Sequence, residues 1–102
     1  MPKVSVLMCV FNHGSRIKNS IDSIIEQTFT DFEFVIVNDG STDDSYRIIN
    51  SYNDNRIRVI NNYKNLGLSK SLNRGLKLCK GDLIARMDAD DISMDNRLEK
   101  QY

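Results

Sequence analysis

Three carboxylates stand close together near the end of the sequence, directly after an apolar run. They are Asp88, Asp90 and Asp91 in the stretch LIARMDADDIS, residues 83–93. Carboxylate oxygens are hard ligands that suit Mg²⁺ or Mn²⁺, and alternate residues leaving a strand can point into the same cleft. The spacing of Asp88 and Asp90 therefore suits a divalent metal. The same stretch could instead cap a following helix, because Asp is favoured before and within a first helical turn.

Polar or glycine-containing segments follow three other apolar runs. They read VFNHG (residues 10–14), NDGSTDD (38–44) and NNYKNLGLS (61–69). In an open parallel sheet, ligands bind beyond the carboxyl ends of the strands, so all four segments would form one rim. The rim is acidic around Asp39 and around residues 88–91, and an anionic ligand could bind there only with a positive charge in between. Considered alone, Asp39 is more often a turn residue than a ligand.

Two glycine-rich motifs that bind phosphate are absent from the sequence. Neither GxGxxG nor GxxxxGK[ST] occurs, and the first turn contains only Gly14. Without backbone amides presented by glycines, the charge of a diphosphate must be neutralised in another way, and a metal held by the Asp-Ala-Asp stretch would supply this.

The elements that must position these residues can be predicted from the apolar pattern. Short runs rich in β-branched residues predict four strands. They cover residues 4–10, 32–37, 57–60 and 83–87. Because the connections between them are long enough for helices, the sequence predicts an α/β fold of Rossmann-like type, with a mainly parallel sheet and flanking helices.

Three connections carry helical spacing. Residues 15–27 place isoleucines at i, i+4, i+7 and i+8 behind Ser15 as a cap. Residues 41–52 open with capping residues and first-turn acids, and residues 69–81 end at Gly81. The side chains expected to face inward are Ile17, Ile21, Ile24 and Ile25, then Tyr46, Ile49 and Tyr52, then Leu68, Leu72, Leu76 and Cys79. A further helix is expected to begin near residue 95.

Composition limits the kinds of partner. The 102 residues suit one domain, and 14 basic against 14 acidic side chains give no net charge, so binding of nucleic acid through bulk charge is not expected. Two cysteines are too few for a disulfide framework, which favours a cytoplasmic protein. The apolar N-terminal run is too short to span a membrane and lacks a signal-peptide cleavage site.

Four motifs in order carry a family resemblance. VSVLMCVFNHG, FVIVNDGSTDDS, NLGLSKSLNRGL and KGDLIARMDADDISMDNRLEKQ together resemble the nucleotide-binding half of a family 2 glycosyltransferase. The resemblance implies the GT-A fold, a nucleotide-diphosphate sugar as donor, in the first place a UDP-sugar, and transfer with inversion, assisted by Mg²⁺ or Mn²⁺. It covers essentially the whole chain.

The resemblance also implies site residues. Asp39 would accept a hydrogen bond from the base, residues 65–67 would close over the nucleotide with Lys70 near the phosphates, and Asp90 would ligate the metal. The nucleotide-binding positions implied are Val10, Phe11, Asn12, Asp39, Asn65, Gly67, Lys70, Asp88 and Ala89. Two departures from the family pattern are Asn38, where many relatives have a second acid, and Leu72, where an arginine is common.

The expected catalytic base, an Asp or Glu, would lie beyond residue 102. We therefore expect residues 1–102 to be the donor-binding part of a glycosyltransferase domain that is truncated at its C-terminus. The acceptor would be a carbohydrate or lipid-linked hydroxyl. The full-length protein could lie at the inner face of the membrane, and an uncovered sheet edge could pair two copies.

Two functions other than sugar transfer are compatible with an acidic cluster in an α/β fold. A receiver domain or an aspartyl phosphatase would place its acids at the end of the first strand, where this sequence has Phe11 and Asn12. A module that binds a nucleotide-sugar without turnover stays open, because no catalytic base can be named within these residues.

Overall fold

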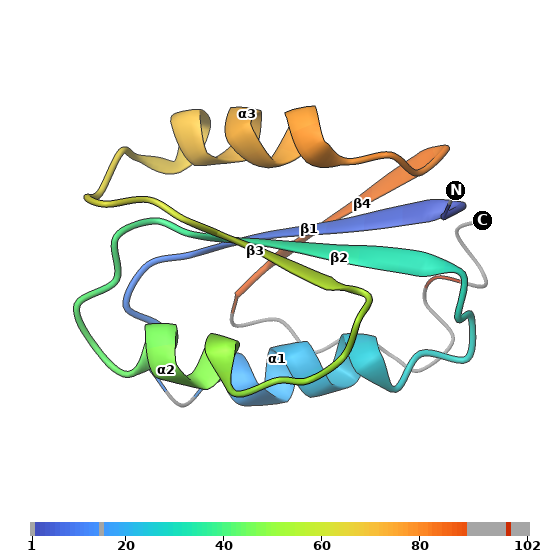
Figure 1. The fold of residues 1–102 in the computed structure, drawn as a ribbon, viewed down its shortest axis with the longest axis horizontal. Coiled ribbons are helices and arrows are strands. Elements are labelled where there is room, and N and C mark those ends of the chain that lie inside the picture. Colours follow the sequence, from blue (N-terminus) through green and yellow to red (C-terminus); the bar gives the residue numbers. More distant parts are fainter. Residues whose placement is uncertain (1, 15, 90–97, 99–102) are drawn as a thin grey trace.

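The computed structural model describes residues 2–14, 16–89 and 98. This part of the chain contains a four-stranded sheet with strand order β3-β2-β1-β4, in which every neighbouring pair is parallel (Figure 1). In chain order the elements are β1 (Val4–Val10), α1 (Arg16–Ile25), β2 (Phe32–Asn38), α2 (Ser45–Asn50), β3 (Ile57–Asn61), α3 (Leu68–Leu78) and β4 (Leu83–Asp88). The predicted α/β class, the four strands and their parallel pairing are confirmed.

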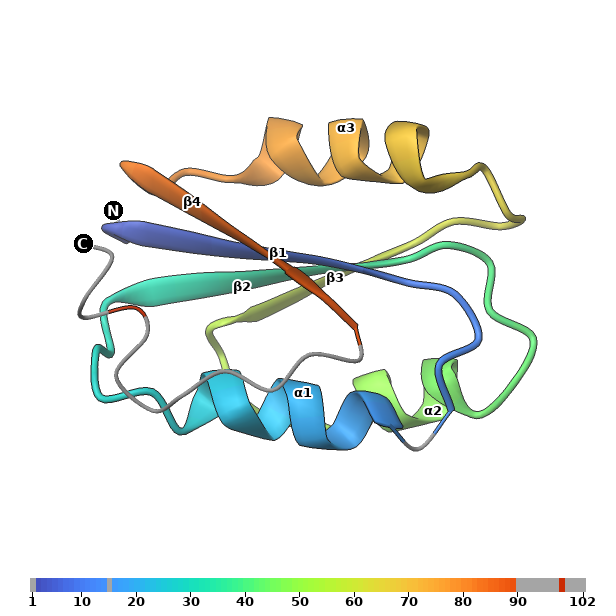
Figure 2. The same cartoon turned by 180° about the vertical axis from the view of Figure 1, so that it is seen from behind.

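Helices cover both faces of the sheet. Helices α1 and α2 lie against one face and α3 lies against the other, as Figures 1 and 2 show from opposite sides. The larger apolar cluster, which includes alternate residues of β1 from Val4 to Val10, packs under α1 and α2. A smaller cluster of Leu7, Val35 and Val37 packs under α3. Because both faces of β1 and β2 are covered, their sequences are almost continuously apolar.

Helix α1 follows the predicted period. Ile17, Ile21 and Ile24 are fully buried, and Ile25 packs partly against the same cluster. The helix ends at Ile25, two residues before the predicted boundary. The amphipathic helix predicted between the first two strands is therefore confirmed.

Helix α3 presents a different face to the sheet from the one that its leucines predict. Leu68 and Leu76 are 56% and 44% exposed, whereas the buried residues of the helix are Ser71 and Gly75. A Cβ atom on Gly75 would overlap Leu7 Cδ1, so the helix backbone lies closer to the sheet than a larger residue would permit. The prediction of an inward leucine stripe is wrong at Leu68 and Leu76, because small residues make this contact.

Helix α2 also differs from its prediction. Ile49 is buried and Tyr52 packs partly against the larger cluster, as expected. Tyr46, however, is 51% exposed, and the buried residue beside it is Ser45. The Ser45 hydroxyl accepts two backbone hydrogen bonds from the β1–α1 loop, at 3.1 and 3.0 Å. This polar contact turns the first turn of the helix toward the loop and leaves Tyr46 facing solvent.

The direction in which strands are added reverses at β1. Strands β2 and β3 lie on one side of β1, and β4 lies on the other. The loops that follow β1, β2 and β3 reach the same end of the sheet in Figure 1. In parallel sheets such a reversal is where ligands bind.

The C-terminal stretch is described only in part. The helix expected near residue 95 lies outside the described residues, as does Asp90. Leu98 is buried, and its backbone N–H donates to Gln27 Oε1 at 3.0 Å. Among the described helices, none is long and apolar enough to cross a membrane.

Candidate functional site

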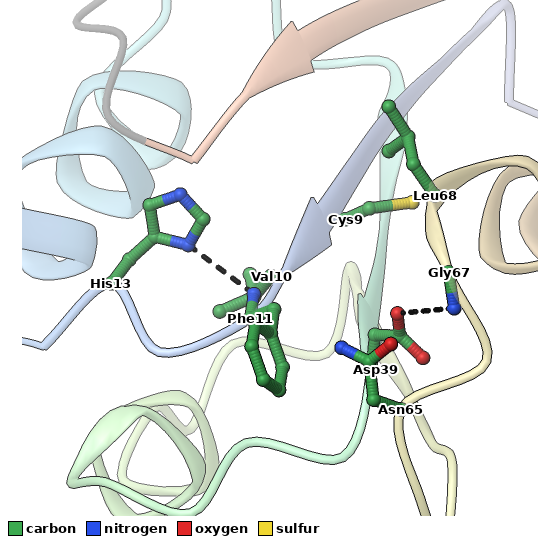
Figure 3. A pocket seen from close by; sticks show the side chains of 8 residues that line it. All are labelled: Cys9, Val10, Phe11, His13, Asp39, Asn65, Gly67 and Leu68. Atoms are coloured by element: carbon green, nitrogen blue, oxygen red, sulfur yellow. Dashed lines mark hydrogen bonds between the residues drawn. The ribbon is translucent and has the colours of Figure 1, made fainter.

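A cavity of about 350 Å³ opens at the carboxyl ends of β1 and β2 (Figure 3). Its floor comes from the end of β1, one wall from the residue after β2, and the opposite wall from the loop that leads into α3. The described lining residues are Cys9, Val10, Phe11, His13, Asp39, Asn65, Gly67 and Leu68. The cavity thus lies beside the strand-order reversal at β1.

Asp39 follows β2 directly and is almost fully buried, with 4% exposure. Its Oδ1 accepts hydrogen bonds from the Leu66 N–H at 2.7 Å and from the Asn62 side-chain amide at 2.9 Å. Its Oδ2 accepts from the Gly67 N–H at 3.0 Å (Figure 3). Burial by itself would raise the pKa of this carboxyl, but these bonds and the nearby Ser71 hydroxyl bring it below the ordinary value. Asp39 is therefore an ionised group that holds the β3–α3 loop, and its role goes beyond that of a turn residue.

Gly40 permits this loop to pass close to the end of β2. Its φ is +71°, in the left-handed region that favours glycine. A Cβ atom here would lie 2.6 Å from Asn65 N and closer still to the carbonyl carbon of Lys64. Since the neighbouring Asp39 fixes the loop from the other side, the backbone at Lys64 and Asn65 cannot simply move away.

The β1–α1 and β2–α2 loops are joined by hydrogen bonds. Asn12 Oδ1 accepts the Thr42 N–H at 2.8 Å, and the Asn12 N–H donates to Ser41 Oγ at 3.1 Å. The Gly14 N–H donates to Asp43 Oδ2 at 3.0 Å. Asn12 has φ +55°, a conformation in which Asn is enriched among non-glycine residues. Its side-chain oxygen thus joins the two loops.

Phe11 and His13 form a compact turn at the end of β1. The Phe11 N–H donates to His13 Nδ1 at 3.2 Å (Figure 3). The Phe11 side chain is 42% exposed, which leaves an aromatic surface at the cavity. The Val10 carbonyl accepts the Asp39 N–H at 2.7 Å and joins the ends of β1 and β2. His13 is partly buried and lines the cavity.

The end of β4 places part of the acidic stretch at the same end of the sheet. Asp88 is exposed and pairs in register with Cys9, which lines the cavity. Ala89 is buried on the α1 side, and its carbonyl accepts a hydrogen bond from the buried Ser20 hydroxyl at 2.7 Å. Helix α1 therefore fixes where the chain leaves β4, immediately before Asp90.

The two departures from the family pattern have structural roles. Asn38 is buried; its amide donates to Asn61 Oδ1 at 3.2 Å and its Oδ1 accepts the Ser41 N–H at 3.2 Å. An aspartate could accept but could not donate to Asn61. Leu72 packs against the apolar cluster under α3. Its side chain thus contributes to packing between helix and sheet.

Some expected site residues meet at the cavity and others do not. Those that line it are Val10, Phe11, Asp39, Asn65 and Gly67. Those outside its described lining are Asn12, Lys70, Asp88 and Ala89, and Lys70 lies exposed on the first turn of α3.

Sequence reasoning missed three lining residues, Cys9, His13 and Leu68. Cys9 could have been found from strand alternation, since it follows Leu7 on the α3 face and is the last such residue of β1. Burial raises the pKa of its thiol to about 11, so it stays protonated at neutral pH. Leu68 gave no signal, because its helical spacing placed it in the core.

The comparison with protein families shows the family of the chain. The family described as Glycosyl transferase family 2 matches residues 5–102, which include the cavity and the acidic stretch. The chain belongs to glycosyltransferase family 2. It spans about a third of the length of curated glycosyltransferases that it matches, for example 31% of one from Haemophilus influenzae.

Relatives and solved structures agree with this membership. The family 2 chain is 41% identical over 103 residues to the O-antigen biosynthesis glycosyltransferase WbnJ of Escherichia coli, covering 97% of this chain and 40% of WbnJ. Staphylococcus aureus TarS 1-349 in complex with UDP-GlcNAc superposes with a TM-score of 0.90 at 30% identity, covering 97% of this chain and 30% of TarS. The mannosyltransferase PcManGT of Pyrobaculum calidifontis, in complex with GDP-Man and Mn²⁺, gives a TM-score of 0.79 at 26% identity, covering 89% and 28%. These neighbours support the GT-A type of fold.

Proposed function

We propose that the cavity binds the nucleoside of a nucleotide-diphosphate sugar, in the first place uridine. The full-length protein would then transfer the sugar to an acceptor hydroxyl with inversion. The observation that carries the proposal is a buried, ionised Asp39 beside an exposed aromatic ring at the strand-order reversal. TarS, which is similar over nearly the whole chain, has been solved with UDP-GlcNAc.

Each part of the base would meet a suitable group. The half-exposed Phe11 ring offers a surface on which a planar base can stack. Uracil carries an imide N–H, which needs an acceptor. A carboxylate oxygen can accept about two hydrogen bonds, and Asp39 Oδ2 accepts from the Gly67 N–H, with the Ser71 hydroxyl also near the carboxylate; Oδ2 would receive the base N–H as its further donor. Residues 65–67, already fixed by Asp39, would lie over the nucleotide.

The negative charge of the diphosphate would be repelled by the carboxylates at this end of the sheet, and a bound metal ion would neutralise it. Asp39 and Asp88 are both at this end of the sheet, and none of the described lining residues is a lysine or arginine. Asp88, with its exposed carboxylate at the end of β4, is a hard oxygen donor of the kind that Mg²⁺ and Mn²⁺ prefer, and Asp90 would complete the pair. PcManGT, a similar structure, was solved with Mn²⁺. A divalent ion bound there would stabilise negative charge on the departing nucleoside diphosphate.

The remaining parts of the reaction belong to the longer protein. The general base, an Asp or Glu beyond residue 102, would take the proton from the acceptor hydroxyl on the face opposite the nucleotide. The acceptor would be a carbohydrate or lipid-linked hydroxyl, in keeping with the O-antigen role in the name of WbnJ. The alternative is a module that binds the nucleotide-sugar without transfer.

The nucleotide site can be tested by exchanging one carboxylate. Asp39→Asn should raise the Kd for UDP, measured by calorimetry with Mn²⁺ present, by about tenfold or more, because asparagine has only one accepting oxygen and places an NH₂ donor where the second carboxylate oxygen stood. Asp82→Asn is the matched control, since Asp82 is an exposed acid in the α3–β4 connection. Its Kd should equal that of the wild-type protein.

Two results would contradict the proposal. Wild-type protein that fails to bind UDP would remove the nucleotide site, and equal affinity of the Asp39→Asn variant would remove Asp39 from it. Release of UDP from UDP-sugars by the full-length protein, dependent on a carbohydrate acceptor, would distinguish transfer from binding without turnover.

A further inference from the structure

Asp39 does not hold its position unaided. Asn62, the residue after β3, is buried, and its backbone N–H donates to the Asn38 carbonyl at 2.9 Å. Its side-chain Nδ2 donates to Asp39 Oδ1 at 2.9 Å and to Ser71 Oγ at 3.0 Å. One amide group thus joins the end of β2 to the first turns of α3.

Arg74 determines which way that amide points. Its Nη1 donates to Asn62 Oδ1 from the second turn of helix α3. A guanidinium has donors and no acceptor, so the amide oxygen must face Arg74 and the NH₂ group must face Asp39. If the amide rotated by half a turn, its NH₂ would meet the guanidinium and its oxygen would meet the Asp39 carboxylate, and both contacts would be repulsive.

We propose that Asn62 and Arg74 are positioning residues for the nucleotide site, acting through Asp39. By fixing an amide donor on Oδ1, they leave Oδ2 as the oxygen available to a base N–H. They also stabilise the ionised carboxylate, the form that accepts such a donor. The part of this inference that concerns the base rests on the proposed binding of uridine, whereas the part that concerns Asp39 does not.

The sequence alone does not indicate that Asn62 and Arg74 act together. Arg58, Ile60 and Asn62 alternate toward the α3 face, so an amide stands where the strand pattern calls for another inward residue. Arg74 is exposed, and nothing in its helical position distinguishes it from Lys77, one turn later.

Substitutions at Arg74 test the inference, because this exposed residue can be changed with little risk to folding. Arg74→Met removes the donor, Arg74→Lys retains a cationic donor, and Lys77→Met is a matched control on the same helix. We expect Arg74→Met to raise the Kd for UDP about threefold to tenfold, with Arg74→Lys in between and Lys77→Met unchanged.

A purely structural role would weaken all ligands alike, so CDP is measured in parallel. Cytosine has no imide N–H, and the preference of the protein for UDP over CDP should therefore fall in Arg74→Met by about the same factor as its UDP affinity. Equal weakening of UDP and CDP, or unchanged UDP affinity, would overturn the inference.

A second readout needs no nucleotide. The Asp39 carboxyl pKa, followed by carbon NMR, should rise in Arg74→Met and not in Lys77→Met. The other titratable side chains that line the cavity, Cys9 and His13, are the same in all variants. If wild-type protein failed to bind UDP, the proposed function would fall while this titration still decided whether Arg74 acts on Asp39; an unchanged pKa would overturn that role.

Discussion

Two carboxylates at opposite ends of the sheet, those of Glu33 and Asp39, accept similar sets of hydrogen bonds but have different structural roles. Glu33, on β2, accepts the Ser5 hydroxyl at 2.5 Å and the Lys80 N–H at 2.6 Å on Oε2. Its Oε1 pairs with Arg58 at 3.2 Å. These bonds fasten the α3–β4 connection to the sheet far from the cavity. Asp39 fastens the β3–α3 loop in the same manner, but it does so at the edge where a ligand can reach it.

Ionisation of Glu33 should contribute to the pH dependence of the free energy of unfolding. Burial alone would raise the pKa of this carboxyl, but its hydrogen bonds and Arg58 bring it below the ordinary value of 4.5. The stabilisation is therefore present above the ordinary pKa and is lost as the pH falls through the lowered one. Glu33→Gln should cost about 2–3 kcal/mol near neutral pH, measured by urea unfolding, and much less near pH 3.

A carboxylate that is exposed provides the control for this measurement. Glu26 is an exposed residue of the α1–β2 connection, and Glu26→Gln should leave the free energy of unfolding near neutral pH within about 0.5 kcal/mol of the wild-type value. If Glu33→Gln lowered stability by the same amount at pH 3 and pH 7, ionisation of Glu33 would not be the source of the effect.

At the scale of residues, the sequence predicted which residues line the cavity better than it predicted their hydrogen-bond partners. Asp39, Phe11 and Gly67 stand at the cavity as expected, because residues that follow buried parallel strands must meet at one edge. The partners of Asp39 could not be predicted. Asn62 and Leu66 reach it through a loop whose path depends on Gly40, and no local pattern specifies that crossing.

The apolar pattern predicted the buried faces of strands β1 and β2 and of helix α1 correctly. It failed on helix α3, where small residues make the contact with the sheet. Most buried positions of strands β1 and β2 and of helix α1 carry large apolar side chains, so period and burial agree there. On α3 the leucine stripe indicated one face, whereas Ser71 and Gly75 define the buried one. Close approach of a helix to a sheet needs small residues, and a hydrophobicity pattern gives these no weight.

Gly75→Ala tests this account of α3. Alanine favours a helix by about 1 kcal/mol over glycine, but the added Cβ would overlap Leu7 Cδ1 in the packed core. Overpacking should prevail, and the free energy of unfolding should fall by about 1–2 kcal/mol in urea titrations. Asn73→Ala, on the exposed side of the same helix, should leave stability equal or slightly higher. A Gly75→Ala variant as stable as wild type would show that the helix is free to move outward.

At the scale of the whole molecule, alternation of strands and helices was sufficient to predict the fold class. It did not determine the strand order, which depends on α3 crossing to the other face of the sheet from α1 and α2 (Figure 2). That crossing creates the reversal at β1, and the reversal brings the ends of β1 and β4 together with Asp39 nearby. The candidate site is thus a product of topology as much as of any one motif.

Because the cavity proposed to bind the nucleoside and the acidic end of β4 come from different strands, their contributions to binding can be separated with two ligands. Uridine is uncharged, so its affinity should depend on Asp39 and not on a divalent ion. UDP adds a diphosphate that must lie among carboxylates, so with EDTA it should bind no more tightly than uridine. With Mn²⁺ it should bind at least about tenfold more tightly, as measured by calorimetry.

Asp90→Asn completes the design, because it removes the expected metal ligand and leaves the described cavity unchanged. In this variant the advantage of UDP over uridine should be lost even with Mn²⁺ present, while uridine affinity is retained. In the Asp39→Asn variant uridine affinity should be lost, while Mn²⁺ should still increase the affinity for UDP. Affinity for UDP that is indifferent to both EDTA and Asp90→Asn would mean that the diphosphate charge is neutralised by some other group, and the metal would then have no place in donor binding.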